Sequence, residues 1–85
     1  MKKILLVEDY EDTRQLMAVM LSFCGYQVVE AKDGYEAVEK ALTERPDLIL
    51  MDIGMPILDG LRATHAIRQH AELAAVRVLA HFRIL

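Results

Sequence analysis

Short apolar runs, separated by segments with helical spacing, constrain the fold of this chain more than any other feature. The runs cover Ile4–Val7, Val28 to about Ala31, Leu48–Met51 and Val76–Ala80. The first and third are apolar along their whole length, which is typical of strands buried on both faces of a parallel sheet. Strands that alternate with helices predict an α/β fold with one parallel sheet, in the order β-α-β-α-β-α-β.

The segment after the first run has the spacing of an amphipathic helix. Asp12 followed by Gln15 resembles a capping box at its start. Gly25 suits the position after its end, because glycine adopts the left-handed conformation without a steric penalty. The apolar residues recur at i, i+3, i+4 and i+7, the spacing of one helical face, and they are Leu16, Val19, Met20 and Phe23.

Two further helices are predicted between the remaining strands. Asp33 with Glu36 forms a second capping-box pattern, and Pro46 closes the segment that it opens. The third helix is expected from Leu61 to about His70. The side chains expected to face inward are Ala37, Val38, Ala41 and Leu42 on the second helix, and Ala63, Ala66 and Ile67 on the third.

Carboxylates follow two of the predicted strands. Glu8 and Asp9 come directly after the first strand, and Asp52 comes directly after the third. The carboxyl ends of parallel strands meet at one edge of the sheet, where ligands bind. Two like charges about 4 Å apart cost ~4 kcal/mol at an effective dielectric constant near 20, so we expect a hard cation such as Mg²⁺ here. The Gly54 carbonyl could turn toward this cation, and Pro56 would stiffen the turn.

These residues resemble the receiver domain of bacterial two-component response regulators. The matching stretches are "ILLVEDYEDTR" and "AKDGYEAVEKALTERPDLILMDIGMPILDG", and the resemblance covers about residues 3–80. It implies a flavodoxin-like, doubly wound parallel sheet with Asp52 as the phosphoacceptor. It also implies that Asp9, Asp52 and the Gly54 carbonyl hold Mg²⁺ directly, while Glu8 acts through water. The phosphoryl group would come from a histidine kinase, a phosphotransfer protein or a small phosphodonor.

Other residues of the motif have structural interpretations. We expect Met55 to pack beside the site, and Pro56, Asp59 and Gly60 to shape the loop and open the third helix. Two alternatives stay open for the acids themselves. Glu8 and Asp9 could be solvated loop residues, and Asp52 could cap a turn, although no helix directly follows that strand.

The resemblance ends before the last part of a complete receiver domain. The family has five strands, whereas we expect residues 1–85 to form a single truncated domain that lacks the last strand and two helices. The family's hydroxyl position falls near Phe82, no Ser or Thr follows Thr64, and no lysine follows Lys40. Because both missing groups contact the phosphoryl group, we expect Mg²⁺ binding with weak or absent phosphorylation.

Charge and composition exclude other classes of partner. The formal net charge is −3, which gives no general attraction to nucleic acid or to anionic membranes. The apolar stretch of "MKKILLVEDY" is too short for a secretory signal or a membrane span. Cys24 is the only cysteine, so no intrachain disulfide can form, and the reducing cytoplasm is the expected location.

Three functional hypotheses follow. The first is a receiver-type signalling module, which is not a turnover enzyme. The second is a phosphorylation-impaired fragment that acts as an interaction module, with a homodimer formed through the apolar, basic segment "VRVLAHFRIL" at residues 76–85. The third is a phosphohydrolase of the haloacid dehalogenase type. That family needs a second Asp two residues after the nucleophile, where this chain has Gly54.

Overall fold

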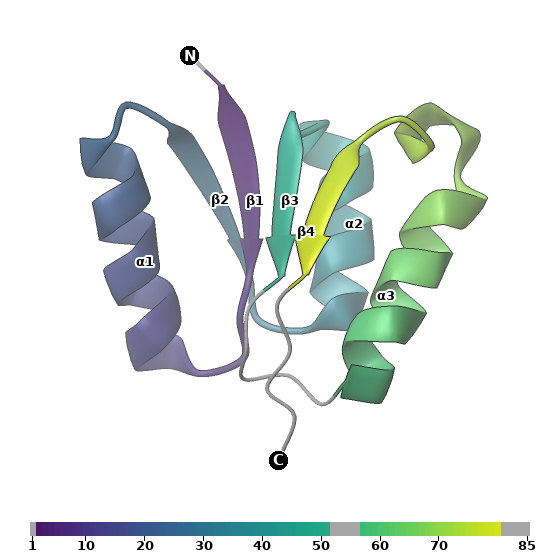
Figure 1. Ribbon diagram of the computed structural model, residues 1–85, viewed down its shortest axis with the longest axis horizontal. Helices are drawn as coiled ribbons and strands as arrows, with labels where there is room; N and C mark the ends of the chain where they lie inside the picture. The colour runs from purple at the N-terminus through teal and green to yellow at the C-terminus, as the bar shows by residue number, and fades with distance from the viewer. Residues whose placement is uncertain (1, 52–56, 81–85) are drawn as a thin grey trace.

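The computed structural model describes residues 2–51 and 57–80, with the backbone alone at 57–60 and 80, and its elements alternate as predicted (Figure 1). A short 3₁₀-helix, η1, lies between the last helix and the last strand. The elements are β1 (Lys3–Val7), α1 (Glu11–Phe23), β2 (Gln27–Ala31), α2 (Gly34–Glu44), β3 (Leu48–Met51), α3 (Ile57–Gln69), η1 (Ala71–Leu73) and β4 (Arg77–Ala80).

The four strands form one parallel sheet in the order β2-β1-β3-β4. Val7 at the end of β1 pairs with Ala31 at the end of β2 and with Met51 at the end of β3. The carboxyl ends of these three strands are therefore level with one another. Figure 1 shows α1 beside β2 and α3 beside β4, with α2 behind the sheet.

The main core lies between the sheet and the pair α2 and α3. Alternate strand residues point into it, because successive side chains of a strand point to opposite faces of the sheet. This core confirms the inward positions predicted for Ala37, Ala41, Ala63 and Ile67. Its buried members are Leu5, Val7, Ala31, Ala37, Ala41, Ile49, Met51, Ala63, Ile67 and Leu73.

Helix α1 is confirmed, but two details of its prediction are wrong. The helix begins at Glu11 with Tyr10 as its N-cap, and no side chain caps it, so Asp12 lies inside the first turn. The predicted apolar face is exposed, with Phe23 at 89 %. The opposite face, which includes Arg14 and Leu21, is half-buried. Arg14 on this face donates hydrogen bonds to the sheet, and periodicity alone does not reveal them.

The ends of α2 match the prediction more closely than those of α3. The Asp33 carboxylate accepts a hydrogen bond from the backbone N–H of Glu36 at 2.8 Å, which confirms the N-cap. Arg45, in the left-handed conformation with φ 49°, ends α2 just before Pro46. Helix α3 begins at Ile57 rather than at Leu61, so that predicted boundary is wrong. Residues 59 and 60 suggested a loop by their low helix propensity, which tertiary context commonly overrides.

Candidate functional site

Glu8 and Asp9 follow β1 directly but lie in different surroundings. Glu8 is only 2 % exposed, and its backbone N–H donates to the Ala31 carbonyl at 3.0 Å, which extends the contact between β1 and β2 by one residue. Its carboxylate accepts from the backbone N–H of Tyr10 at 3.2 Å. Asp9 is exposed. One acid is therefore fixed inside the sheet edge, while the next faces solvent.

Arg14 holds this end of the sheet together, and sequence reasoning assigned it no role. Its Nη1 donates to the backbone carbonyl of Glu8 at 3.1 Å, and its Nε donates to the carboxylate of Glu30 at 3.2 Å. The side chain is only 15 % exposed. A helix-borne arginine directly after an acidic strand end was the available signal, because a guanidinium can bridge two acceptors in one plane.

Several predicted site residues lie outside the part of the chain that the structure describes. These are Asp52, Gly54, Met55, Pro56 and Phe82. Asp59 and Gly60 lie in the first turn of α3. Among the described residues, no group of three or more metal-ligating side chains comes together. The described half of the predicted site therefore consists of the two acids after β1.

The last lysine of the sequence contacts β2 and α2 rather than the predicted phosphoryl site. Lys40 on α2 donates from its Nζ to the backbone carbonyl of Glu30 at 2.5 Å, and it lies 3.8 Å from the carboxylate of Glu36. These contacts hold the side chain against β2 and its own helix. Lys40 is therefore not positioned as a substitute for the phosphoryl-binding lysine of the family.

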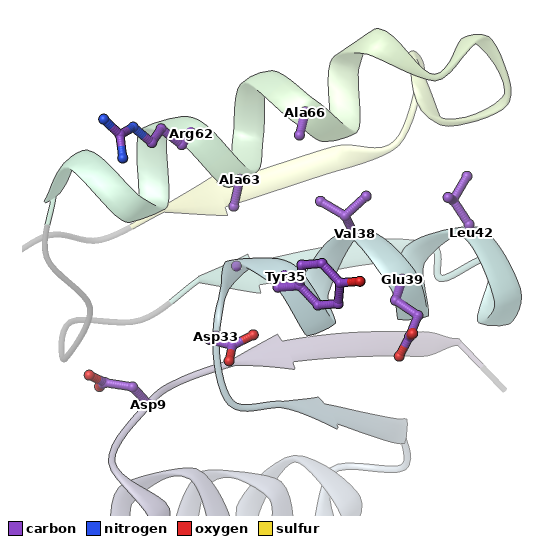
Figure 2. Close-up of a pocket in the computed structure, with 10 residues that line it drawn as sticks. Asp9, Asp33, Tyr35, Val38, Glu39, Leu42, Arg62, Ala63 and Ala66 are labelled. Carbon is purple, nitrogen blue, oxygen red and sulfur yellow. The ribbon is translucent and has the colours of Figure 1, made fainter.

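A groove of about 790 Å³ runs between α2 and α3 and reaches Asp9 at one end (Figure 2). Near the carboxyl edge of the sheet, its described lining includes two acids, Asp9 and the N-cap Asp33. The rest of its described lining comes from α2 and α3. Its other residues are Gly34, Tyr35, Val38, Glu39, Leu42, Arg62, Ala63 and Ala66.

Comparison with known proteins identifies the class to which this fold and site belong. Residues 4–82 match the family described as the response regulator receiver domain. The chain therefore belongs to the response regulator receiver domain family, whose members serve in two-component signalling. This confirms both the resemblance and the flavodoxin-like fold predicted from the sequence.

Individual relatives and neighbours agree with this assignment. The chain is 42 % identical over 78 residues to the alkaline phosphatase synthesis transcriptional regulatory protein PhoP of Bacillus subtilis, covering 92 % of this chain and 32 % of PhoP. It is 39 % identical over 79 residues to protein PilH of Pseudomonas aeruginosa, covering 93 % of this chain and 65 % of PilH. The chain thus spans about a third to two thirds of the length of these relatives.

Two solved structures show the same arrangement of elements. The chemotaxis protein CheY4 of Vibrio cholerae superposes with a TM-score of 0.85 at 35 % identity, covering 94 % of this chain and 67 % of that one. The receiver domain of the sensor histidine kinase PA1611 of Pseudomonas aeruginosa has a TM-score of 0.84 at 40 % identity, covering 93 % and 65 %. The latter is described with a magnesium ion coordinated in its active site cleft. In the described part of our chain, no helix is both long and apolar enough to span a bilayer.

Proposed function

We propose that this receiver domain accepts a phosphoryl group on Asp52 from a histidine kinase or phosphotransfer protein, in the cytoplasm and without acting as a turnover enzyme. One observation carries this proposal. Met51, which precedes Asp52 in the chain, pairs with Val7, which precedes Glu8. Two acid-bearing segments thus leave the sheet from paired positions on neighbouring strands, as a shared metal and phosphoryl site requires.

The donor groups available at this edge suit Mg²⁺. Carboxylate and carbonyl oxygens are the hard ligands that this ion prefers, and it keeps several waters. We propose that Asp9, Asp52 and the Gly54 carbonyl hold it, while the buried Glu8 acts through water. The fixed carboxylate of Glu8 and the solvent-facing Asp9 fit these two roles. When bound, Mg²⁺ neutralises charge on the oxygens of the transferring phosphoryl group.

Phosphorylation of this 85-residue chain should be slow. No Ser or Thr follows Thr64, and Lys40 is both the last lysine and held against β2. Removing one donor aimed at developing negative charge typically costs ~3–4 kcal/mol of transition-state stabilisation. This corresponds to a rate lower by about two to three orders of magnitude.

The test is to incubate the protein with Mg²⁺ and acetyl phosphate and to weigh the intact chain. We expect a slow gain in mass of one phosphoryl group, absent from Asp52→Asn and retained in Asp12→Asn, whose carboxylate lies on α1. An equal gain in Asp52→Asn would contradict the assignment of the phosphoacceptor. No gain in the wild-type protein, alongside saturable Mg²⁺ binding, would support the second candidate below.

The second candidate is a phosphorylation-impaired receiver that works as an interaction module through a homodimer. The observation in its favour is that β4 is an edge strand of the described sheet and that Leu79 on it is 54 % exposed. An apolar edge strand offers unpaired backbone groups to a second chain. The dimer would form through residues 76–85, as proposed from their apolar and basic composition.

A further inference from the structure

The groove between α2 and α3 exists because small side chains on α3 face larger ones on α2. In Figure 2, Ala63 and Ala66 point from α3 toward α2, while Val38 and Leu42 point from α2 toward α3. Ala63 is 4 % exposed, and Ala66, Val38 and Leu42 are half-buried. The helices pack through these residues, but the small alanines leave an apolar groove open between the two helices.

The groove is elongated along the helix axes. Tyr35, Val38 and Leu42 lie at i, i+3 and i+7, so they follow one face of α2 for about two turns, or roughly 10 Å. Tyr35 is 82 % exposed and adds an accessible aromatic ring to one wall. A linear groove with apolar walls matches a docked helix, whose anchoring side chains recur with the same spacing.

The charged residues around the groove favour a partner of opposite charge. Among the described residues that line it, Asp9, Asp33 and Glu39 are acidic and Arg62 is basic. Arg62 points away from α2 in Figure 2. The Glu39 carboxylate makes no hydrogen bond or ion pair with another described residue, so it is available to a ligand. The described part of the groove's rim is thus net negative, and its described floor is apolar.

We infer that this groove binds a basic amphipathic helix of a partner protein, with apolar residues between Val38, Leu42 and Ala66 and a lysine or arginine near Glu39. Among the described residues, the groove shares Asp9 with the proposed metal site beside Asp52. Variants are therefore placed away from Asp9, and binding is measured without added Mg²⁺. Failure of Asp52 to take a phosphoryl group would leave this inference unaffected.

The probe is a fluorescein-labelled helical peptide of leucine and lysine, with leucines at i, i+3, i+4 and i+7. Its counterpart carries glutamate in place of lysine. Fluorescence anisotropy should show saturable binding of the leucine–lysine peptide to the intact chain and no binding of the leucine–glutamate peptide. Equal binding of both peptides, or of neither, would overturn the inference.

Three variants locate the binding. Ala66→Leu fills the groove and should weaken binding by at least about ten-fold. Glu39→Arg reverses an exposed charge without disturbing the core, and should also weaken binding, by about three-fold or more. Glu11→Gln, a matched loss of charge on α1, should change nothing. Unchanged binding in both Ala66→Leu and Glu39→Arg would show that the peptide binds elsewhere and would refute the proposal.

Discussion

Arg14 shows how a single residue decides the geometry of the site. Its guanidinium donates to the Glu8 carbonyl at the end of β1 and to the Glu30 carboxylate on β2. A lysine in its place would present a point charge rather than a planar fork, and could not make both contacts with the same geometry. The backbone that presents Glu8 and Asp9 is thus tied to the adjacent strand and to α1.

Of the two residues predicted to cap helices, one does so in the structure and the other does not, and the difference predicts a difference in stability. Asp33 caps α2 through the backbone N–H of Glu36, whereas Asp12 caps nothing. Asp33→Ala should lower the free energy of unfolding by about 1 kcal/mol, because it leaves an N–H of the first turn unsatisfied. Urea denaturation monitored by circular dichroism measures this loss.

The control for this prediction is Asp12→Ala, which removes the same kind of side chain from the first turn of α1. It should change the free energy of unfolding by only a few tenths of a kcal/mol, the typical effect of charge near an exposed helix N-terminus. A loss of similar size in both variants would mean that Asp33 acts through its charge rather than as a cap.

At the scale of whole elements, α1 shows that a helix can be predicted correctly while the face that packs against the sheet is predicted wrongly. Leu16, Val19 and Phe23 form a regular apolar stripe, yet all three are more than half exposed. The side toward the sheet includes Arg14, Met17 and Leu21. Both sides of α1 carry apolar residues, so its hydrophobic pattern alone does not distinguish the packing face. The polar contacts of Arg14 lie on the side that packs against the sheet.

The connection between α3 and β4 depends on one arginine of α3. Arg68 donates from Nη1 to the backbone carbonyls of Leu73, Ala74 and Val76, at 3.3, 3.0 and 2.5 Å. Arg68→Ala should lower the free energy of unfolding by about 1 kcal/mol, since these bonds are partly exposed to solvent. The amide groups of η1 should exchange hydrogen faster in the variant, as measured by NMR.

Arg62→Ala is the matched control on the same helix, because Arg62 makes no hydrogen bond or ion pair with another described residue. We expect its exchange rates and its stability to stay close to those of the wild-type protein. Protection of η1 that is equal in Arg68→Ala and in Arg62→Ala would contradict a role for Arg68 in this connection.

For the molecule as a whole, the sheet has two edges among its described strands, β2 and β4. The proposed homodimer uses the β4 edge, so a charge on that strand should prevent pairing. We expect Leu79→Lys to shift the protein from dimer to monomer in sedimentation velocity at micromolar concentration. Leu61→Lys on α3 is the control, because Leu61 and Leu79 are both 54 % exposed.

A wild-type chain that sediments as a monomer at high micromolar concentration would rule out this dimer. Equal dissociation by Leu61→Lys and Leu79→Lys would show that the interface is not confined to β4. The peptide-binding groove lies between α2 and α3, so neither outcome bears on it.

Much of the fold and part of the site were predictable because they depend on local patterns. The apolar runs locate the strands, the Asp33–Glu36 pattern locates the start of α2, and the acids after Val7 locate the binding edge. The start of α3 and the role of Arg14 were not predictable. Local propensity disfavours a helix at residues 59 and 60, yet α3 includes both. The role of Arg14 depends on contacts with two strands, which local propensity does not describe.

The sequence by itself determined the order of strands and helices, the family, and the acids proposed to bind metal, because spacing and residue type define these features. Tertiary structure decided which face of α1 packs, how the ends of β1 and β3 align, and that an acidic, apolar groove lies between α2 and α3. These features arise only when separate segments meet, since register, side-chain packing and pairing of charges are properties of contacts rather than of any one stretch of chain.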